Sequence, residues 1–381
     1  MMTSHNKRIK VVILYGGQSV EHEVSCRSAS FIFKHIDKQL YEPVGVGVDH
    51  QGHWWPQSFP ESFEPPRQLS IAKSVKRSEL SPGAQALGPR EMLWYLCGLD
   101  QSINASELVF FPIIHGTHGE DGRLQGLLEM ADVAFVGADT LASAVSMDKV
   151  FSKQLVANCG IPVAPYQSFS SYDWEWNKDS IIKKAIDDLG LPLFVKPSSL
   201  GSSVGISKVT SRSELHNACE QALKFDDKVL IEQGMEGIRE IECAVLGNYQ
   251  LECAYPGEII PQGGFYSYDA KYVDDKAAIV QVPAELSEKE ARGAKEMAIR
   301  TASALGICGM ARIDFFLDPK SGNYLFNEAN TIPGFTEISQ YPRLWQNEGI
   351  DGRELVQKLV RLAQERATKK QGLQRVYQGK T

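Results

Sequence analysis

The sequence lacks the features that mark membrane proteins, disulfide-stabilised secreted domains and nucleic-acid binders. No stretch approaches the ~20 consecutive apolar residues that a membrane-spanning helix needs. The seven cysteines are odd in number and form no C-x-x-C pair, which in a chain of 381 residues indicates free thiols in a reducing compartment. The net charge of −7 argues against nucleic acid as the main partner. We therefore expect a cytoplasmic protein that binds neither membranes nor nucleic acid.

Clusters of zinc ligands are also missing from the sequence pattern. The chain has eight histidines and seven cysteines, and neither residue type recurs at the spacing of zinc ligands. A zinc site is therefore not expected, and any chemistry must come from acids, lysines, arginines and glycine-rich loops.

The length of 381 residues corresponds to two or three domains, at ~100–200 residues per domain. In residues 1–140, apolar strands such as 11–14 alternate with helical periodicity and glycine-rich turns. This alternation predicts an α/β domain in which helices cover the faces of a parallel sheet. Residues 51–105 break the alternation, and we expect an insertion or an irregular segment there.

The rest of the chain predicts two further domains and a tail. Residues 141–232 combine helices with hairpin strands, which indicates a small α+β domain that begins with a single helix ending at Gly160. Residues 233–366 again mix strands and helices, and one strand is expected over 249–259. Residues 367–381 are expected to form a polar tail.

A glycine-serine loop lies in the stretch VKPSSLGSSVGISKV, residues 195–209. Phosphate is bound by free backbone N–H groups and positive charge, and Lys196, Ser202 and Ser203 offer a charge and two hydroxyl donors. The loop joins two strands instead of a strand and a helix, so it differs from the Walker phosphate loop. We predict a hairpin that covers phosphates. A flexible surface turn explains the same residues, and the loop alone does not decide between the two.

A second constellation lies in residues 311–335, where two apolar strands flank a Pro-Lys-Ser-Gly turn. The two-residue period of a strand puts Arg312 and Asp314 on one face, and it does the same for Glu328 and Asn330. Two carboxylates and an amide form a hard-oxygen site suited to Mg²⁺, and the arginine suits a developing anion. The alternative is a structural network of ion pairs.

Several shorter motifs carry weaker signals. Glu21 and the turn HGTHGEDG at 115–122 both follow predicted strands, where ligands of open α/β sheets bind. Helix-terminal acids and ordinary glycine turns explain them equally simply. The segment FYSYDAKY, residues 265–272, could be a lid that closes on a substrate or merely a packed aromatic loop. Glu232 and Glu240 would meet adenine and ribose hydroxyls if a nucleotide lies in a cleft beside them.

Taken together, these motifs resemble those of the ATP-grasp ligases, and within them those of the D-alanine–D-alanine ligases. The matching stretches occur in the order of the family and span residues 11 to about 345: GGQSVEHEVS, HGTHGEDGRLQG, SMDK, VKPSSLGSSVGISKV, YDAKY, RIDFFL and NEANTIPGFT. The resemblance implies an ATP-grasp fold with an N-terminal parallel-sheet domain. It also implies a reaction in which ATP activates one D-alanine as an acyl phosphate and a second D-alanine attacks it, for peptidoglycan synthesis.

The resemblance also implies roles for individual residues in binding ATP and metal. ATP would be held by its phosphates, its adenine and its ribose, through Lys149, Lys196, Ser203, Glu232, Glu240 and Lys271. Two Mg²⁺ or Mn²⁺ ions would be bound by Asp314, Glu328 and Asn330. Activation by K⁺ is a further feature that the resemblance leaves open.

The remaining implied roles concern the two amino acids. Glu21 would meet the ammonium of the first D-alanine and share hydrogen bonds with Ser202 and the lid residue Tyr272, while His115 would lie near its carboxylate. Arg312 and the backbone N–H of Gly334 would stabilise the tetrahedral oxyanion. The second substrate would meet Ser339 and Gln340, the latter being a position where relatives often carry an apolar residue.

The lid sequence YDAKY follows the pattern of ligases that form the dipeptide, so D-alanine is expected as the second substrate. The alternatives are a ligase that uses D-lactate or D-serine, and a nucleotide-binding sensor without catalysis. Relatives also suggest a homodimer.

Overall fold

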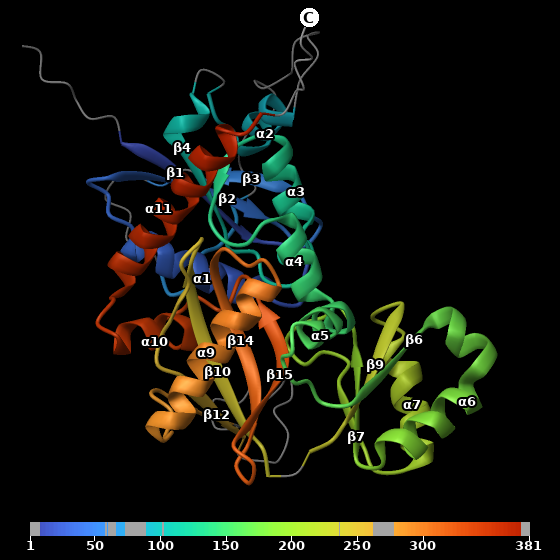
Figure 1. Ribbon diagram of the computed structural model, residues 1–381. Helices are drawn as coiled ribbons and strands as arrows, with labels where there is room; N and C mark the ends of the chain where they lie inside the picture. Colours follow the sequence, from blue (N-terminus) through green and yellow to red (C-terminus); the bar gives the residue numbers. More distant parts are fainter. Residues whose placement is uncertain are drawn as a thin grey trace, which may run out of the picture.

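In the part of the chain that the structure describes, three β-sheets follow one another and form the framework of the molecule (Figure 1). The computed structural model describes residues 8–57, 59, 66–72, 89–100, 103–235, 237–261 and 278–374.

The N-terminal sheet has the strand order β3-β2-β1-β4-β5 and is parallel except at its β3 edge. Successive residues of the central strand point into two different cores, so that Val11 and Ile13 face one layer while Val12 and Leu14 face the other. Burial on both faces is what a parallel sheet between helices requires, and it confirms the predicted α/β class. The elements are β1 (Ile9–Gly16), α1 (His22–His35), β2 (Tyr41–Val48), β3 (Trp54–Gln57), α2 (Pro89–Cys97), the 3₁₀ turn η2 (Ala105–Glu107), β4 (Leu108–Pro112), α3 (Arg123–Met130), β5 (Ala134–Phe135) and α4 (Thr140–Met147).

The central sheet is antiparallel, with the order β6-β9-β7-β8, and α6 and α7 pack on one of its faces. Val195 and Ile231 belong to the core beneath these helices. Lys196 and Glu232, their neighbours in sequence, therefore lie on the opposite face, which is turned toward the third sheet. The elements are α5 (Lys149–Asn158), β6 (Tyr166–Ser170), α6 (Ser171–Leu189), β7 (Leu193–Pro197), β8 (Ser207–Val209), α7 (Arg212–Ala222) and β9 (Lys228–Gln233).

The third sheet is antiparallel, with the order β13-β12-β10-β14-β15 and β11 paired to β10. Helix α9 covers one face, where Ile241, Ile313 and Phe326 are fully buried. Five charged residues alternate with these apolar residues and occupy the other face: Glu240 and Glu242 of β10, Arg312 and Asp314 of β14, and Glu328 of β15. The elements are β10 (Arg239–Gly247), β11 (Glu252–Cys253), β12 (Gly257–Pro261), β13 (Ala278–Gln281), α9 (Glu288–Ala304), β14 (Gly309–Asp318), β15 (Asn323–Asn330), α10 (Gln340–Asn347) and α11 (Gly352–Gln371).

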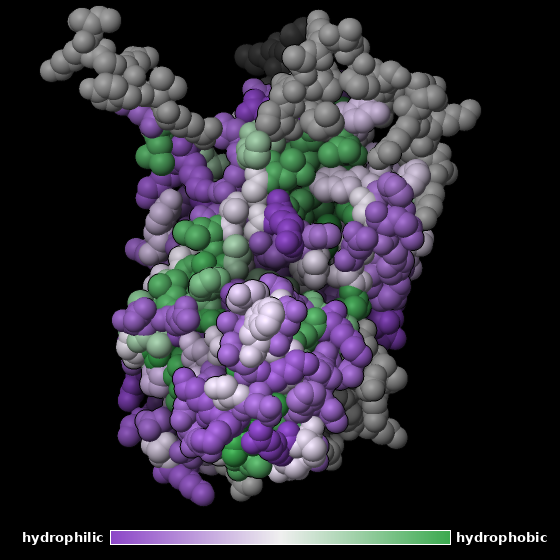
Figure 2. Space-filling view, turned by 90° about the vertical axis from the view of Figure 1, so that its right-hand side faces the viewer, coloured by the Kyte–Doolittle hydropathy of each residue, from purple (hydrophilic) through white to green (hydrophobic). Residues whose placement is uncertain are grey.

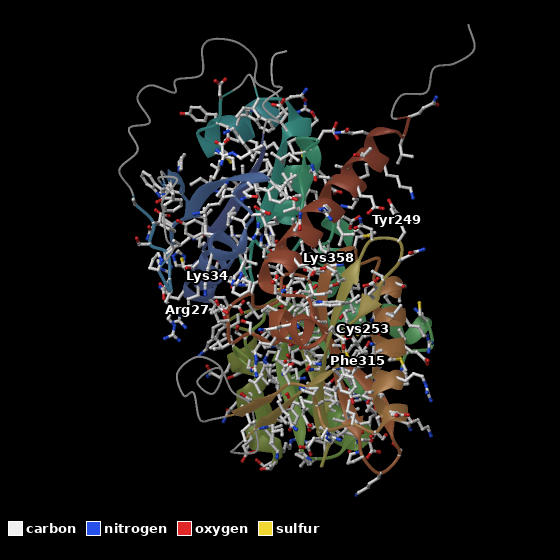
Figure 3. The ribbon with its side chains drawn as sticks, turned by 90° about the vertical axis from the view of Figure 1, so that its left-hand side faces the viewer. Arg27, Lys34, Tyr249, Cys253, Phe315 and Lys358 are labelled. Atoms are coloured by element: carbon white, nitrogen blue, oxygen red, sulfur yellow. The ribbon has the colours of Figure 1, made fainter. Side chains whose placement is uncertain are left out.

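The last described helix, α11, packs against the N-terminal sheet, so the C-terminal part of the chain contacts the N-terminal part. Helix α11 runs from the third sheet up to the first (Figures 1 and 3), and it continues to Gln371, into the segment expected to be a tail. Near its end, buried Arg366 donates to the carbonyl oxygens of Gly137 and of Phe135, the latter at 2.8 Å. These bonds satisfy carbonyl oxygens at the last residue of β5 and two residues beyond it, so the helix covers this edge of the sheet.

Three sequence expectations about secondary structure were wrong in detail. The single helix expected to end at Gly160 is broken into α4 and α5, because Asp148 adopts an extended conformation and its side chain accepts from the N–H groups of Val150 and Phe151. Such a cap favours a new helix start over continuation. The strand expected over 249–259 is divided into β11 and β12 around Pro256, which has no N–H to donate. Residues 51–105 were expected to be an insertion or an irregular segment; an irregular segment was wrong for the described part of this range, which contains β3 and α2.

None of the described helices is long and apolar enough to cross a membrane. Figure 2, which faces the central sheet and its helices, shows a mainly hydrophilic surface there with scattered apolar residues.

Candidate active site

The charged face of the third sheet is organised by the hairpin of β14 and β15. The register places Arg312 opposite Asn330 and Asp314 opposite Glu328, so the predicted residues share one face as their spacing indicated. The guanidinium of Arg312 forms two hydrogen bonds of 2.8 Å to Asp314, and it lies 3.1 Å from Glu242 of β10. Burial alone would lower the pKa of Arg312, but Asp314 and Glu242 outweigh burial and raise it.

The same hairpin offers a set of oxygen atoms that fits a divalent cation. Asn330 donates its side-chain N–H to Asp314 at 3.0 Å, which leaves the amide oxygen of Asn330 as an acceptor. Glu328 lies 3.3 Å from the ammonium of Lys149. The ion-pair network that the sequence left as an alternative is therefore present. Its carboxylate and amide oxygens are also the ligands that Mg²⁺ and Mn²⁺ prefer.

Lys149 is the first residue of α5. It connects the glycine-serine loop to the hairpin of β14 and β15, whose oxygen atoms fit a divalent cation. Its ammonium donates to the carbonyl oxygen of Leu200 at 2.6 Å, and its backbone N–H donates to the carbonyl oxygen of Ser198 at 2.9 Å. The preceding residue, Asp148, accepts from the Ser198 hydroxyl at 2.7 Å and pairs with Lys228 at 2.6 Å. The cap that starts α5 thus also fixes the start of the loop.

The loop itself lies against the end of the first strand of the molecule. The hydroxyl of Ser202 donates to the carboxylate of Glu21, 181 residues earlier in the chain. Ser202 and Ser203 both have positive φ angles, 54° and 58°, in the left-handed region that side chains other than glycine rarely adopt. Such backbone strain is found where the surroundings impose it, often at functional sites. A hairpin loop with this contact is not a free surface turn.

Lys196 and Glu232 meet on the inner face of the central sheet together with a lysine that sequence reasoning missed. One oxygen of Glu232 lies 2.5 Å from the ammonium of Lys196, and the other lies 2.6 Å from that of Lys153 in α5. Burial opposes ionisation of Glu232, but the two lysines outweigh it and lower the pKa of its carboxyl to about 2. Glu232 is only 2% exposed, and both of its oxygens face lysines. The sequence instead predicted that Glu232 meets adenine or ribose.

His115 and the turn that follows it connect the first and third sheets. Nδ1 of His115 donates to the carbonyl oxygen of Ile332 at 2.8 Å, and Nε2 accepts from Ser28 at 2.9 Å. Burial lowers the pKa of His115 even though Glu21 favours its charged form, so the ring is neutral at neutral pH. Both ring nitrogens are already engaged, so a contact with a substrate carboxylate would have to replace one of these bonds.

Glu120 is a buried acid of the same turn, and it too was missed. Its carboxyl accepts from the N–H groups of Gly116 and Ile332, at 3.1 and 3.2 Å. Burial and the nearby carboxylate of Glu21 raise the pKa of Glu120 to about 8. The group therefore helps hold the turn against residue 332 and brings a second acid close to Glu21.

The residues assigned to the oxyanion and to the second substrate lie together after β15. Ser339 Oγ accepts from the N–H of Thr336 at 3.1 Å, and a Cβ added at Gly334 would come within 3.0 Å of that oxygen. Gln340 is 5% exposed, and neither polar atom of its amide has a hydrogen-bond partner among the described residues.

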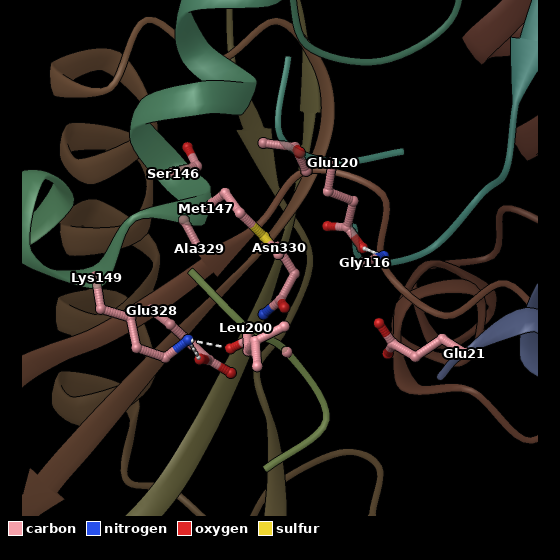
Figure 4. A pocket seen from close by; sticks show the side chains of 12 residues that line it. Glu21, Gly116, Glu120, Ser146, Met147, Lys149, Leu200, Glu328, Ala329 and Asn330 are labelled. Carbon is pink, nitrogen blue, oxygen red and sulfur yellow. Dashed lines mark hydrogen bonds and ion pairs between the residues drawn. The ribbon is translucent and has the colours of Figure 1, made fainter. Parts of the chain in front are cut away.

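Figure 4 shows a small cavity between the three sheets that only some of these groups line; Lys196, Glu232, Arg312 and Ser339 are not among its lining residues. Glu21 and Glu120 enter it from the N-terminal side, Lys149 and Leu200 from the start of α5 and the loop, and Glu328 from the hairpin, where Asn330 also lines it. Glu240 lies apart from this cavity, half-buried on β10 opposite Phe316. Lys271 and Tyr272 fall outside the described residues.

The acids and the lysine that the sequence reasoning missed had recognisable signals. Glu242 follows Glu240 by two residues, so it shares the face of that strand. Lys153 follows Lys149 by four residues, so both point the same way from one helix.

The fold also brings together a group that no sequence spacing indicated. His22, Glu23 and His50 have potential ligand atoms within 4.8 Å of one another, although a zinc site was not expected. The rings of His22 and His50 are stacked, with centroids 3.9 Å apart and an interplanar angle of 27°. The lone pairs of imidazole nitrogens lie in the ring plane, so in stacked rings they run side by side and do not converge on one point. A tetrahedral ion shared by both rings would therefore require one ring to turn.

The glycine-serine loop faces the hairpin of β14 and β15, with its carboxylate and amide oxygens, across the cavity. This arrangement and the order of the sheets identify the chain as an ATP-grasp ligase. The family model described as D-ala D-ala ligase N-terminus matches residues 10–138, and that described as D-ala D-ala ligase C-terminus matches residues 155–361. The chain belongs to the D-alanine–D-alanine ligase family. Its activity is the ligation of D-alanine to D-alanine, a step in the synthesis of peptidoglycan precursors.

Relatives of known name cover nearly the whole chain. A D-alanine–D-alanine ligase from Oceanobacillus iheyensis is 41% identical over 96% of this chain and 97% of its own length. D-alanine–D-alanine ligase A from Escherichia coli K12 is also 41% identical, over 94% and 97%. Among solved structures, the D-alanine-D-alanine ligase from Coxiella burnetii has a TM-score of 0.76 at 32% identity, covering 96% of this chain and 97% of that one. The VanG D-Ala:D-Ser ligase from Enterococcus faecalis has a TM-score of 0.77 at 33% identity, covering 93% and 99%.

Proposed function

We propose that the chain joins the two D-alanines through a D-alanyl phosphate, with ATP as the phosphate donor. A carboxylate oxygen of the first D-alanine attacks the γ-phosphorus of ATP, and ADP leaves. The amine of the second D-alanine then attacks the carbonyl carbon and loses a proton, and phosphate leaves from the tetrahedral intermediate. The observation that carries this proposal is that Glu21, Lys149 and Glu328 all project into the same cavity.

The first D-alanine would lie with its ammonium at Glu21, which the Ser202 hydroxyl holds in place. A cationic group suits this place because it would neutralise the carboxylate of Glu21 and lower the cost of ionising Glu120, whose pKa burial and Glu21 raise. The lid residue Tyr272 is proposed to complete this set, and His115 is proposed to lie near the carboxylate of this substrate.

The phosphates of ATP would be bound by Lys149, Lys196 and the loop that carries Ser203, with Lys271 on the γ-phosphate. The buried lysines are positioned for this role by ion pairs at 3.3 and 2.5 Å to Glu328 and Glu232. Glu240 is proposed to meet the ribose. Mg²⁺ or Mn²⁺ bound by the hairpin acids and by Asn330 would neutralise charge on the phosphate oxygens.

The oxyanion of the tetrahedral intermediate would be stabilised by Arg312 and by the N–H of Gly334. Arg312 is suited to this role because its guanidinium is held by Asp314 and Glu242 and stays charged. Preorganised donors of this kind need no rearrangement when charge develops.

The second D-alanine is proposed to bind beside Ser339 and Gln340. D-Serine is a specific alternative, because the E. faecalis structure of similar fold is titled a D-Ala:D-Ser ligase. D-Lactate is a further alternative. Incubation of the chain with ATP, Mg²⁺, D-alanine and each acceptor, with ADP release measured and the product identified by mass, separates the three. Greater turnover with D-serine or D-lactate than with D-alanine at neutral pH would overturn the acceptor assignment, and ATP binding without acceptor-dependent ADP release would indicate a sensor.

The physical setting of the reaction is also proposed. The demand for ATP supports a cytoplasmic enzyme, and a homodimer is the expected assembly, which light scattering of the purified chain would test. Addition of K⁺ to the same assay would show whether it activates.

A further inference from the structure

Lys153, Glu232 and Lys196 form a buried ion-pair cluster at the centre of the molecule. This cluster carries one more positive than negative charge. Glu232 has two oxygens and binds a different lysine with each, Lys196 at 2.5 Å and Lys153 at 2.6 Å. The side chains of these three residues are 2%, 8% and 0% exposed, with Lys153 the most buried. A buried charge that lacks a partner is costly, so this arrangement is suited to an anion that joins it.

Lys153 is the member of this ion-pair cluster that no substrate can reach, because its side chain is fully buried. Besides Glu232, its ammonium donates to the carbonyl oxygen of Phe326 at 3.0 Å and lies over the Phe326 ring at 5.8 Å. It thereby connects three elements: α5, the central strand β9 and the hairpin strand β15. Burial lowers the pKa of Lys153, and the contact with Glu232 opposes that change.

Lys196 is the member that faces the cavity side of the sheet. It ends β7 immediately before the glycine-serine loop, and it lies over the rings of Phe194 and Phe316 at 6.0 and 5.8 Å. If Lys196 were the sole partner of Glu232, the carboxylate would neutralise it and compete with any phosphate. Because Lys153 shares the carboxylate, the three residues together keep a net positive charge. Lys196 therefore retains an attraction for an anion.

We propose that Lys153 is a positioning residue for nucleotide binding: it holds one oxygen of Glu232 so that Lys196, held by the other, keeps positive charge for the phosphates of ATP. This inference rests on the proposed function, in which Lys196 binds those phosphates. It assigns Lys153 no contact with either D-alanine.

The test is the affinity for MgATP, measured by calorimetry on the full chain without D-alanine, together with steady-state KM values. Lys153→Met replaces the lysine by an apolar side chain of similar length, which a buried site tolerates. It is expected to weaken MgATP binding at least about tenfold, a change of about 1.4 kcal/mol. The KM for each D-alanine is expected to change by less than about twofold. Lys183→Met, at an exposed lysine paired with Asp187 on α6, is the matched control and is expected to leave both unchanged.

A double variant separates charge from packing. In Lys153→Met combined with Glu232→Gln, no carboxylate neutralises Lys196, so MgATP should bind more tightly than to Lys153→Met alone. Both variants share the same methionine, so any loss of packing cancels in the comparison. An unchanged MgATP affinity in Lys153→Met, or a double variant that binds no better than the single one, would overturn the proposal. Absence of acceptor-dependent ADP release in the unaltered chain would instead refute the proposed function.

Discussion

Replacement of Arg312 by lysine is the perturbation whose outcome the structure defines most closely. Arg312 makes two bonds of 2.8 Å to Asp314 and a contact of 3.1 Å to Glu242, and these two acids are 7% and 8% exposed. A lysine keeps the positive charge between the two acids but cannot reproduce the planar fork of the guanidinium. We therefore expect a folded protein whose kcat falls about 10²-fold, as when one oxyanion donor is lost.

The companion variant Arg312→Ala should behave differently, because it leaves Asp314 and Glu242 buried without their cation. Removing one member of a buried ion pair costs about 3–5 kcal/mol, so this variant should lose stability as well as turnover. Urea unfolding and kcat, both measured at pH 7, test these expectations. Near-normal kcat in the Arg312→Lys variant would refute the assignment of Arg312 to the oxyanion, and an Arg312→Ala variant as stable as the unaltered chain would refute the account in which the arginine holds two buried acids.

Three further changes have expected outcomes that single measurements check. Ser202→Ala removes the hydroxyl that holds Glu21, and should raise the KM for the first D-alanine about tenfold while MgATP affinity is kept; an unchanged KM would contradict this role. Gln340→Leu removes a buried amide that has no partner among the described residues, and should raise the free energy of unfolding by about 1 kcal/mol; a loss measured by urea unfolding would show that the amide is satisfied. Glu232 has a pKa near 2 when folded, below its value of about 4.3 when unfolded, so its contribution to stability of about 3 kcal/mol is present above pH ~4.3 and lost as pH falls toward 2. The stability gap between the unaltered chain and Glu232→Gln should therefore narrow over that window, and a gap independent of pH would contradict the pairing.

Much of the fold and part of the site could be predicted because they depend on local pattern. Strand period alone placed Arg312 with Asp314 and Glu328 with Asn330, and the register of β14 and β15 agrees. The hairpin around the glycine-serine loop followed from β-branched residues on both sides, and β7 pairs with β8 accordingly. The helix break at Asp148 was missed, because a capping aspartate inside a helical period is outweighed by its apolar neighbours in any pattern average.

The sequence by itself determined most of the order of strands and helices, the faces of the hairpin strands that carry charge, and the family to which the chain belongs. Only the tertiary structure decided which charges meet: Glu232 with Lys153 and Lys196, Arg312 with Glu242, and Ser202 with Glu21. The physical reason is that a side chain's face follows from the two-residue or 3.6-residue period of its own element, whereas its partner depends on how distant elements pack. The partners of a buried charge are therefore fixed by packing between sheets, and the glycine-serine loop became part of a site only when Glu21 was brought against it.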